Sequence, residues 1–146
     1  MNAAYLDSSA IVKLYVDEAY SHDVEALFRD ADTVLCHRIG YIEVRAALAA
    51  ARRAGRIEET AYLAIVTDFR SDWSSYSLVG VDDPLIERAA ELAEGFGLRG
   101  YDSLHLASAD HTRLTVQGLS FVSFDKALNR AARLLGLRIP DFVPLA

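Results

Sequence analysis

The chain opens with Ala3-Ala4-Tyr5-Leu6-Asp7-Ser8-Ser9-Ala10-Ile11-Val12-Lys13, in which a short apolar run ends at an acidic residue and a helical pattern follows. The same arrangement returns near the other end of the sequence, in Leu119-Ser120-Phe121-Val122-Ser123-Phe124-Asp125. Each run is typical of a short buried strand that leads into a helix. In an open parallel α/β sheet, the carboxyl ends of the strands share the edge at which ligands bind. The two stretches therefore predict such a sheet, with Asp7 and Asp125 together at its binding edge.

Strands and helices alternate along the rest of the chain, with no low-complexity segment, internal repeat or linker. Strands are predicted at residues 3–6, 33–36, 76–81 and 120–124, with a last edge strand at 138–139. Helices are predicted at residues 8–15, 21–29, 39–54, 57–70, 82–96, 102–110 and 126–135. This order favours a single domain over residues 1–146, with a three-layer α/β/α fold and a mainly parallel central sheet.

The composition narrows the classes of function. The 146 residues are 52% apolar and carry a net charge of −6. No basic region precedes the first apolar stretch, and no apolar run approaches the ~18 residues of a membrane span, so we expect a soluble cytoplasmic protein. Cys36 is the only cysteine, which excludes intrachain disulfides and multi-cysteine zinc sites. The negative charge argues against nucleic-acid binding through a basic field, but not against an enzyme whose metal inverts the charge of an acidic site.

Three acidic residues, Asp7, Asp102 and Asp125, stand where helices are predicted to begin. Aspartate is a favoured N-cap, so capping alone explains each of them. A cap uses one carboxylate oxygen and leaves the other for a ligand, so both roles can coexist. Clustered carboxylates repel one another unless a cation lies among them, and hard oxygen ligands suit Mg²⁺ and Mn²⁺. We therefore expect a Mg²⁺ site here, with Mn²⁺ as a substitute ion.

Glu43 has no capping explanation, because it lies within the helix predicted at residues 39–54. At helical spacing it shares a face with the apolar residues Ile39, Ala46, Ala47 and Ala50. A carboxylate on an inward face costs several kcal/mol unless it is paired or bound to a metal. The pattern therefore predicts that Glu43 is a metal ligand; the alternative is a buried salt bridge to an arginine such as Arg38 or Arg99.

The other chemistry-bearing residues give weaker signals. His105 and His111 are six positions apart and share no helix face, and no histidine pair has the spacing of a zinc protease. Ordinary surface or core positions are expected for all four histidines. No serine or cysteine has the context of a nucleophile elbow, and no glycine-rich phosphate loop is present.

Four sequence blocks together make the chain resemble the PIN-domain ribonucleases, specifically the VapC-type toxins of bacterial toxin–antitoxin pairs. The blocks are, in order, Tyr5 to Lys13, Tyr41 to Ala47, Tyr101 to Ala107 and Phe121 to Leu128. The resemblance spans nearly the whole chain. It implies a flavodoxin-like strand arrangement, an RNA substrate, homodimerisation and a small VapB-type antitoxin as partner.

The resemblance also implies roles for single residues. The family's metal-binding acids fall on Asp7 and Asp102, and then on Glu43 and Asp125, and all four are candidate catalytic residues. The family's small hydroxyl residue two positions after the first acid matches Ser9, which we add to the candidate site. Ser103 stands where many members have alanine, which leaves the neighbouring acid intact.

The expected reaction is the metal-dependent hydrolysis of RNA phosphodiester bonds. Candidate phosphate contacts are Lys13, Arg38, Arg45 and Arg99. A phosphotransferase of the haloacid-dehalogenase type also begins with a strand-end Asp, but it needs a second Asp where Ser9 stands. A non-catalytic PIN-like protein-binding module would use its acids only to cap helices and pair with arginine, and the predicted inward position of Glu43 argues against it.

Overall fold

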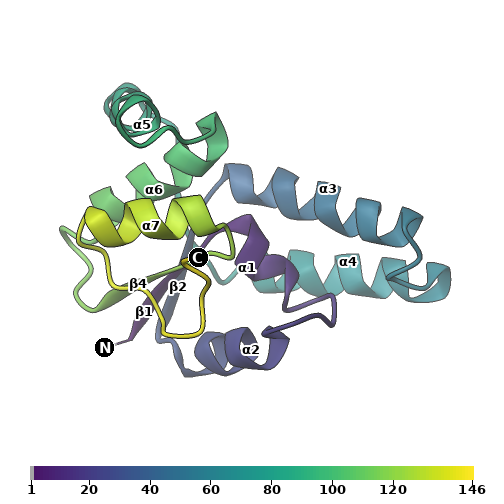
Figure 1. The fold of residues 1–146 in the computed structure, drawn as a ribbon. Coiled ribbons are helices and arrows are strands. Elements are labelled where there is room, and N and C mark those ends of the chain that lie inside the picture. Colours follow the sequence, from purple (N-terminus) through teal and green to yellow (C-terminus); the bar gives the residue numbers. More distant parts are fainter. Residues whose placement is uncertain (1) are drawn as a thin grey trace.

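A parallel sheet organises the protein, in a computed structural model that describes residues 2–146. Its four strands lie in the order β3-β2-β1-β4, and every neighbouring pair is parallel. Figure 1 labels β1, β2 and β4. The strands are β1 (Ala3–Leu6), β2 (Thr33–His37), β3 (Ser77–Val79) and β4 (Leu119–Val122). The mainly parallel sheet predicted from the sequence is confirmed.

Helices cover both faces of the sheet. They are α1 (Ser8–Val12), α2 (Ser21–Asp30), α3 (Ile39–Arg53), α4 (Glu59–Trp73), α5 (Asp83–Phe96), α6 (Gly100–Thr112) and α7 (Lys126–Leu134). One apolar core joins α1 to α4 to the sheet, and a second joins α5 to α7 to it. Along β1, Ala4 and Leu6 enter the first core, whereas Ala3 and Tyr5 enter the second. A strand buried on both faces must be apolar throughout, which explains its sequence and confirms the three-layer α/β/α prediction.

The edges of the sheet are shorter than predicted. The strand expected at residues 76–81 covers only Ser77–Val79, and the one expected at 138–139 is reduced to a single bridge between Ser120 and Arg138. Pro140, two residues after Arg138, has no N–H to donate, which limits pairing at this edge.

No helix within residues 2–146 has the length and apolarity needed to cross a membrane.

The strand order places the ends of β1 and β4 side by side. The chain builds from β1 through β2 to β3 on one side, and then crosses to β4 on the other side of β1. Leu6 lies opposite Val122, and the backbone N–H of Asp7 donates to the Val122 carbonyl at 3.1 Å. In open α/β sheets ligands bind where the strand order reverses in this way. The seam between β1 and β4 is therefore the expected binding position.

Helix α6 is buried over most of its length, since every residue from Ser103 to Ala109 is buried. It contacts α5, α7 and β2. Polar side chains in such a helix need partners, and Ser108 finds one within the helix by donating to the Leu104 carbonyl at 2.7 Å. His105 differs from it, because both of its ring nitrogens contact residues outside α6.

Close packing at the start of α3 depends on a glycine. A Cβ added to Gly40 would lie 2.5 Å from the Cys36 sulfur and 3.8 Å from Cε1 of His105. Protein interiors are packed too densely to absorb such an overlap without movement. Gly40 therefore lets α3 approach both β2 and α6.

Gly40→Ala should destabilise the protein by about 1–3 kcal/mol, because the added methyl group overpacks this contact. Gly95→Ala is the matched control: Gly95 lies in α5, and an added Cβ there meets nothing within 4 Å. That change should stabilise the protein by about 0.5–1 kcal/mol. Urea unfolding of both variants measures the difference. Equal stability of the two variants would contradict the close approach at Gly40.

Candidate active site

The four predicted acids come from four different elements; Glu43 and Asp102 line one cavity, Arg99 links Asp102 to Asp125, and Ser9 links Asp7 to the loop before Asp125. Asp7 is the N-cap of α1, Glu43 lies on α3, Asp102 lies in the first turn of α6 and Asp125 is the N-cap of α7. The capping roles of Asp7 and Asp125 are confirmed. The capping role of Asp102 is wrong, because α6 begins two residues earlier, with Arg99 at the cap position.

Asp7 is the most buried of these acids, with 3% of its surface exposed. Its Oδ1 accepts hydrogen bonds from the Ser9 hydroxyl at 2.6 Å and from the Ala10 N–H at 3.1 Å. Burial raises the pKa of the Asp7 carboxyl above its ordinary value, and the opposing effects of His105 and of these donors do not cancel the increase. A desolvated carboxylate of this kind favours a nearby cation.

Ser9 connects the two strand ends. While its hydroxyl donates to Asp7, its oxygen accepts the backbone N–H of Phe124 at 2.9 Å. Ser9 therefore fixes the Asp7 carboxylate relative to the loop that carries Asp125. The structure brings Ser9 into the predicted site as a bridging residue.

Glu43 lies beside the inner face of α3 and not on it. The buried residues of this helix are Gly40, Val44, Leu48 and Ala51, whereas Ala46 and Ala50 are exposed. The predicted apolar stripe was wrong because alanine buries little area and is tolerated on either face. The Glu43 side chain is 22% exposed, and its Oε1 lies 2.5 Å from Nε2 of His105. The alternative pairing of Glu43 with Arg38 or Arg99 is also wrong.

Arg99 links the other two acids. Its Nε donates to Oδ2 of Asp102 at 2.9 Å, and its Nη2 donates to Oδ2 of Asp125 at 3.3 Å. Oδ1 of Asp125 accepts the Leu128 N–H and so caps α7. The Arg99 side chain is 80% exposed, so water surrounds most of the guanidinium. An exposed cationic side chain therefore balances two of the four carboxylates.

The donor chemistry at this edge suits a hard cation, since carboxylate oxygens are the ligands that Mg²⁺ prefers. As placed, no three Asp, Glu, His or Cys side chains in the described chain, residues 2–146, are arranged to hold a metal ion. Asp102 and Asp125 are occupied by Arg99. The residues suit a divalent ion in chemical type, but their carboxylates must first move closer together, which includes the release of Asp102 and Asp125 from Arg99.

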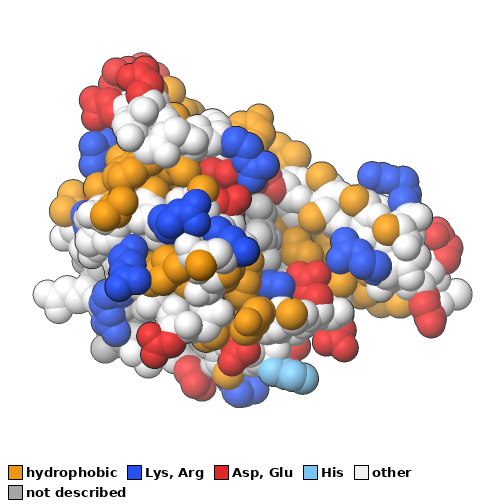
Figure 2. Space-filling view, in the orientation of Figure 1, with side chains coloured by type: hydrophobic (Ala, Val, Ile, Leu, Met, Phe, Trp, Pro, Cys, Tyr) orange, Lys and Arg blue, Asp and Glu red, His pale blue; other side chains and the backbone are white. Residues whose placement is uncertain are grey.

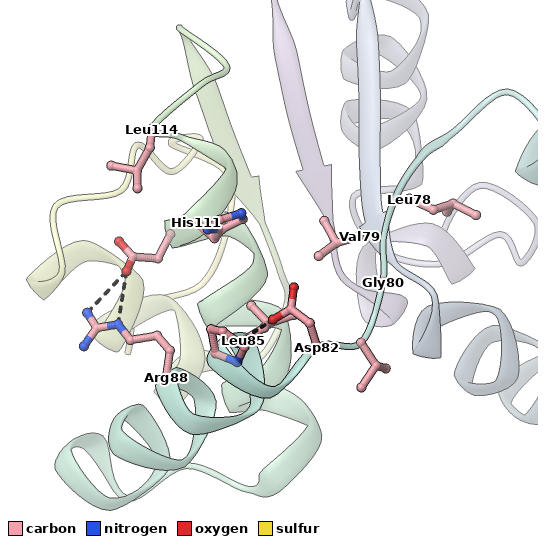
Figure 3. A pocket seen from close by; sticks show the side chains of 11 residues that line it. Leu78, Val79, Gly80, Asp82, Leu85, Arg88, His111 and Leu114 are labelled. Atoms are coloured by element: carbon pink, nitrogen blue, oxygen red, sulfur yellow. Dashed lines mark hydrogen bonds and ion pairs between the residues drawn. The ribbon is translucent and has the colours of Figure 1, made fainter.

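A cavity of about 400 Å³ adjoins these groups and is lined by Glu43, Arg99, Gly100, Tyr101 and Asp102. A larger cavity of about 710 Å³ lies elsewhere, between the end of β3 and helices α5 and α6 (Figure 3). Two of its charged lining residues, Arg88 and Asp110, pair with each other at 3.2 Å, and Asp110 also contacts Arg113 at 2.6 Å. Two of the four predicted acids, Glu43 and Asp102, line the smaller cavity and none lines the larger one, so we take the smaller cavity as the candidate active site.

The predicted phosphate contacts differ in availability. The Lys13 ammonium is buried and donates to Glu18 at 3.1 Å and to the Ala19 carbonyl at 2.8 Å, so it has a structural role.

The three predicted arginines differ from one another. Arg45 donates to the Tyr41 hydroxyl at 2.8 Å, and Arg38 is exposed. Basic side chains are scattered over the face seen in Figure 2 and form no continuous patch there. Arg99 is the one that lines the candidate active site.

Sequence reasoning missed His105. The available signal was its position three residues after Asp102, which places both on one face of a helix. Its two partners, Tyr5 and Glu43, lie on β1 and α3. The sequence of α6 alone does not show that these two elements pack against His105.

Comparison with known proteins gives the family. A model of the PIN domain matches residues 4–134. Ribonuclease VapC45 of Mycobacterium tuberculosis (strain CDC 1551 / Oshkosh) is 35% identical over 139 residues, which cover 95% of each protein. Ribonuclease VapC46 of Mycobacterium tuberculosis (strain ATCC 25618 / H37Rv) is 34% identical over 143 residues, which cover 95% of this chain and 97% of the relative.

Solved structures share the fold. PAE2754 from Pyrobaculum aerophilum aligns with a TM-score of 0.66 at 19% identity, over 94% of this chain and 83% of that one. A toxin-antitoxin complex from Klebsiella pneumoniae aligns with a TM-score of 0.60 at 16% identity, over 84% of this chain and 87% of that one. At these identities the likeness concerns the fold alone. The family match and the sequence relatives, taken with the acid-lined strand ends, show that the chain belongs to the PIN-domain family.

Proposed function

We propose that this protein is a VapC-type endoribonuclease that hydrolyses RNA phosphodiester bonds with Mg²⁺, for which Mn²⁺ can substitute. Membership of the PIN-domain family and sequence relatives named ribonuclease VapC support the activity. The observation that carries the metal dependence is the Asp7 carboxylate, which is buried at the β1–β4 seam with a raised pKa. A carboxylate that is costly to ionise alone gains most from a bound cation.

Asp7 and Asp102 would be the main ligands, with Glu43 and Asp125 completing the site. A bound divalent ion would lower the pKa of a water molecule and neutralise charge that develops on the phosphate. The chain's own residues prepare for this chemistry. Ser9 fixes Asp7, and the α7 backbone fixes one oxygen of Asp125. Arg99, once released from the carboxylates, lies at the cavity where an RNA phosphate would bind, and its planar guanidinium suits that contact.

The partners follow from the same relatives. We propose a VapB-type antitoxin as the inhibitor of the nuclease, a homodimer as the assembled form and the cytoplasm as the location. The relatives' names and the toxin-antitoxin complex of similar fold support the antitoxin. The dimer and the location are expectations from the family resemblance.

Asp7→Asn and Asp102→Asn should each abolish RNA cleavage while the fold is retained, because each removes a charged ligand at constant volume. Loss of more than about 100-fold is expected, since even outer partners of metal ligands are worth about 10- to 100-fold. Cleavage of total RNA with Mn²⁺, together with circular dichroism, measures this. Asp82→Asn is the matched control: Asp82 caps α5 outside the site, and it should keep full activity. Near wild-type cleavage by both site variants would refute the assignment.

Arg99→Gln should raise the affinity for Mn²⁺, because the ion no longer competes with the guanidinium for Asp102 and Asp125. The gain should stay below about tenfold, since exposed ion pairs are weak. Isothermal titration calorimetry measures it. Arg133→Gln, at an exposed position in the last turn of α7, controls for the change in net charge. Equal affinity gains in both variants would indicate a general charge effect and no competition at the site.

Asp7→Asn should stabilise the metal-free protein at neutral pH. The raised pKa means that ionisation of Asp7 opposes folding, fully so above the folded-state pKa and not at all below the ordinary value of 3.8. Asparagine cannot ionise, yet its oxygen can still accept from Ser9 and Ala10. Its advantage should therefore shrink as the pH falls from the folded-state pKa toward 3.8. Urea unfolding in EDTA across this range tests the sign; a difference independent of pH would show that ionisation is not the cause.

A further inference from the structure

His105 is a buried polar residue at the edge of the candidate active site. It is 1% exposed and lies one turn after Asp102 on α6. Its Nε2 contacts Oε1 of Glu43 at 2.5 Å, and its Nδ1 contacts the Tyr5 hydroxyl at 2.7 Å. The imidazole therefore joins the central strand of the sheet to an acid of the site.

The directions of these hydrogen bonds follow from the available donors. The Glu43 carboxylate can only accept, so Nε2 of His105 must carry a hydrogen. In the neutral ring Nδ1 is then an acceptor for the Tyr5 hydroxyl, whose oxygen accepts the backbone N–H of His37 at 3.0 Å. The proton of the neutral ring is then on Nε2, where it is donated to Glu43. A doubly protonated ring would also donate from Nε2. Both forms therefore present the same N–H to the same carboxylate oxygen.

The far end of this chain of hydrogen bonds is rigid. Tyr5 is fully buried in β1 and stacks on Phe121, with ring centroids 5.7 Å apart. Tyr5 and His105 meet edge to face at 5.9 Å. Gly40, one helical turn before Glu43, allows α3 to approach within contact of the imidazole. The ring of His105 is thus held in place by its packing in the core.

Glu43 needs such a restraint. Its side chain is partly exposed on a helix surface, and a free glutamate there would populate several rotamers. With Oε1 held by His105, Oε2 is left for a ligand in the cavity that Glu43 lines. Partners that orient ligand side chains in this way are worth about 10- to 100-fold in metal affinity or activity.

We propose that His105 is a positioning residue of the site, which holds Glu43 through its Nε2–H and is itself oriented by the hydroxyl of Tyr5. The inference rests on the proposed function, because its effect is exerted on the binding of a divalent ion by Glu43. It assigns to Tyr5 and His105 a role beyond their packing in the core.

A matched pair of amides tests the proposal. In His105→Gln the amide nitrogen takes the place of Nε2 and can still donate to Glu43. In His105→Asn the shorter side chain reaches only the Tyr5 side. Both variants bury one amide, so a purely structural role of His105 would affect them alike. The Mn²⁺ dissociation constant, measured by calorimetry, should rise about 10- to 100-fold for Asn and only a few-fold for Gln.

A double-mutant cycle shows whether His105 acts through Glu43. In a Glu43→Gln background, His105→Asn should cause no further loss of Mn²⁺ affinity, because the group that it positions no longer carries charge. Equal losses for Asn and Gln in the folded proteins, or the same loss with and without Glu43, would overturn the proposal. If His105→Asn does not fold, the ¹⁵N NMR measurement of the wild-type imidazole decides the proposal instead.

The outcomes for the two proposals are distinguishable. Wild-type protein that binds no Mn²⁺ and cleaves no RNA would refute the proposed function and this inference together. Wild-type protein that does both, with His105→Asn unchanged, would refute only the positioning role. A third measurement needs no metal: ¹⁵N NMR of the imidazole should show hydrogen on Nε2 in the wild type, and hydrogen on Nδ1 alone would contradict the hydrogen-bond directions.

Discussion

The site depends on the desolvation of one carboxylate at the seam between β1 and β4. Parallel pairing of these strands removes Asp7 from water, and its own backbone N–H completes the pairing by donating to Val122. The same seam holds Ser9 against the loop before α7. Local groups satisfy one oxygen of Asp7 but do not offset the cost of its charge. The other three acids come from α3, from the first turn of α6 and from the N-cap of α7.

The remaining charges are balanced by side chains of two different kinds. Arg99 is exposed, and it pairs with Asp102 and Asp125. His105 is buried and fixed, and it pairs with Glu43 from the core side. An exposed pair is weak and easily exchanged, whereas a buried hydrogen-bonded contact restrains geometry. The protein therefore combines an exposed counter-ion that is easily exchanged with a buried contact that restrains one acid, an arrangement that suits the proposed binding of a divalent cation.

The sequence predicted the parts of the site that depend on local pattern. Asp7 and Asp125 were placed correctly because buried parallel strands are apolar throughout, so the first acid after each run marks a strand end. The sheet and its three layers followed from the same pattern. The start of α6 was placed two residues late, because Arg99 and Gly100 give no capping signal.

The parts that depend on tertiary contacts were not predictable. The helix face chosen for Glu43 rested on alanines, which do not distinguish a buried surface from an exposed one. The partner of Glu43 lies 62 positions away on another helix, and His105 gave no motif that pointed to it. The pairing of Arg99 with two acids also requires that α6 and α7 begin near one another. In each case the missing information was the relative position of two elements, which no single stretch of sequence contains.

The position of β4 in the chain has a consequence for biosynthesis. The seam that buries Asp7 forms only when residues 119–122 add to the sheet next to β1, and Asp125 follows them directly. A nascent chain released before this point would carry Asp7 on an unpaired strand edge, with neither the Ser9–Phe124 contact nor the α7 cap. Incomplete translation products should therefore lack the assembled acid cluster, so the ribosome would deliver a competent site only once it had synthesised the chain through its last strand.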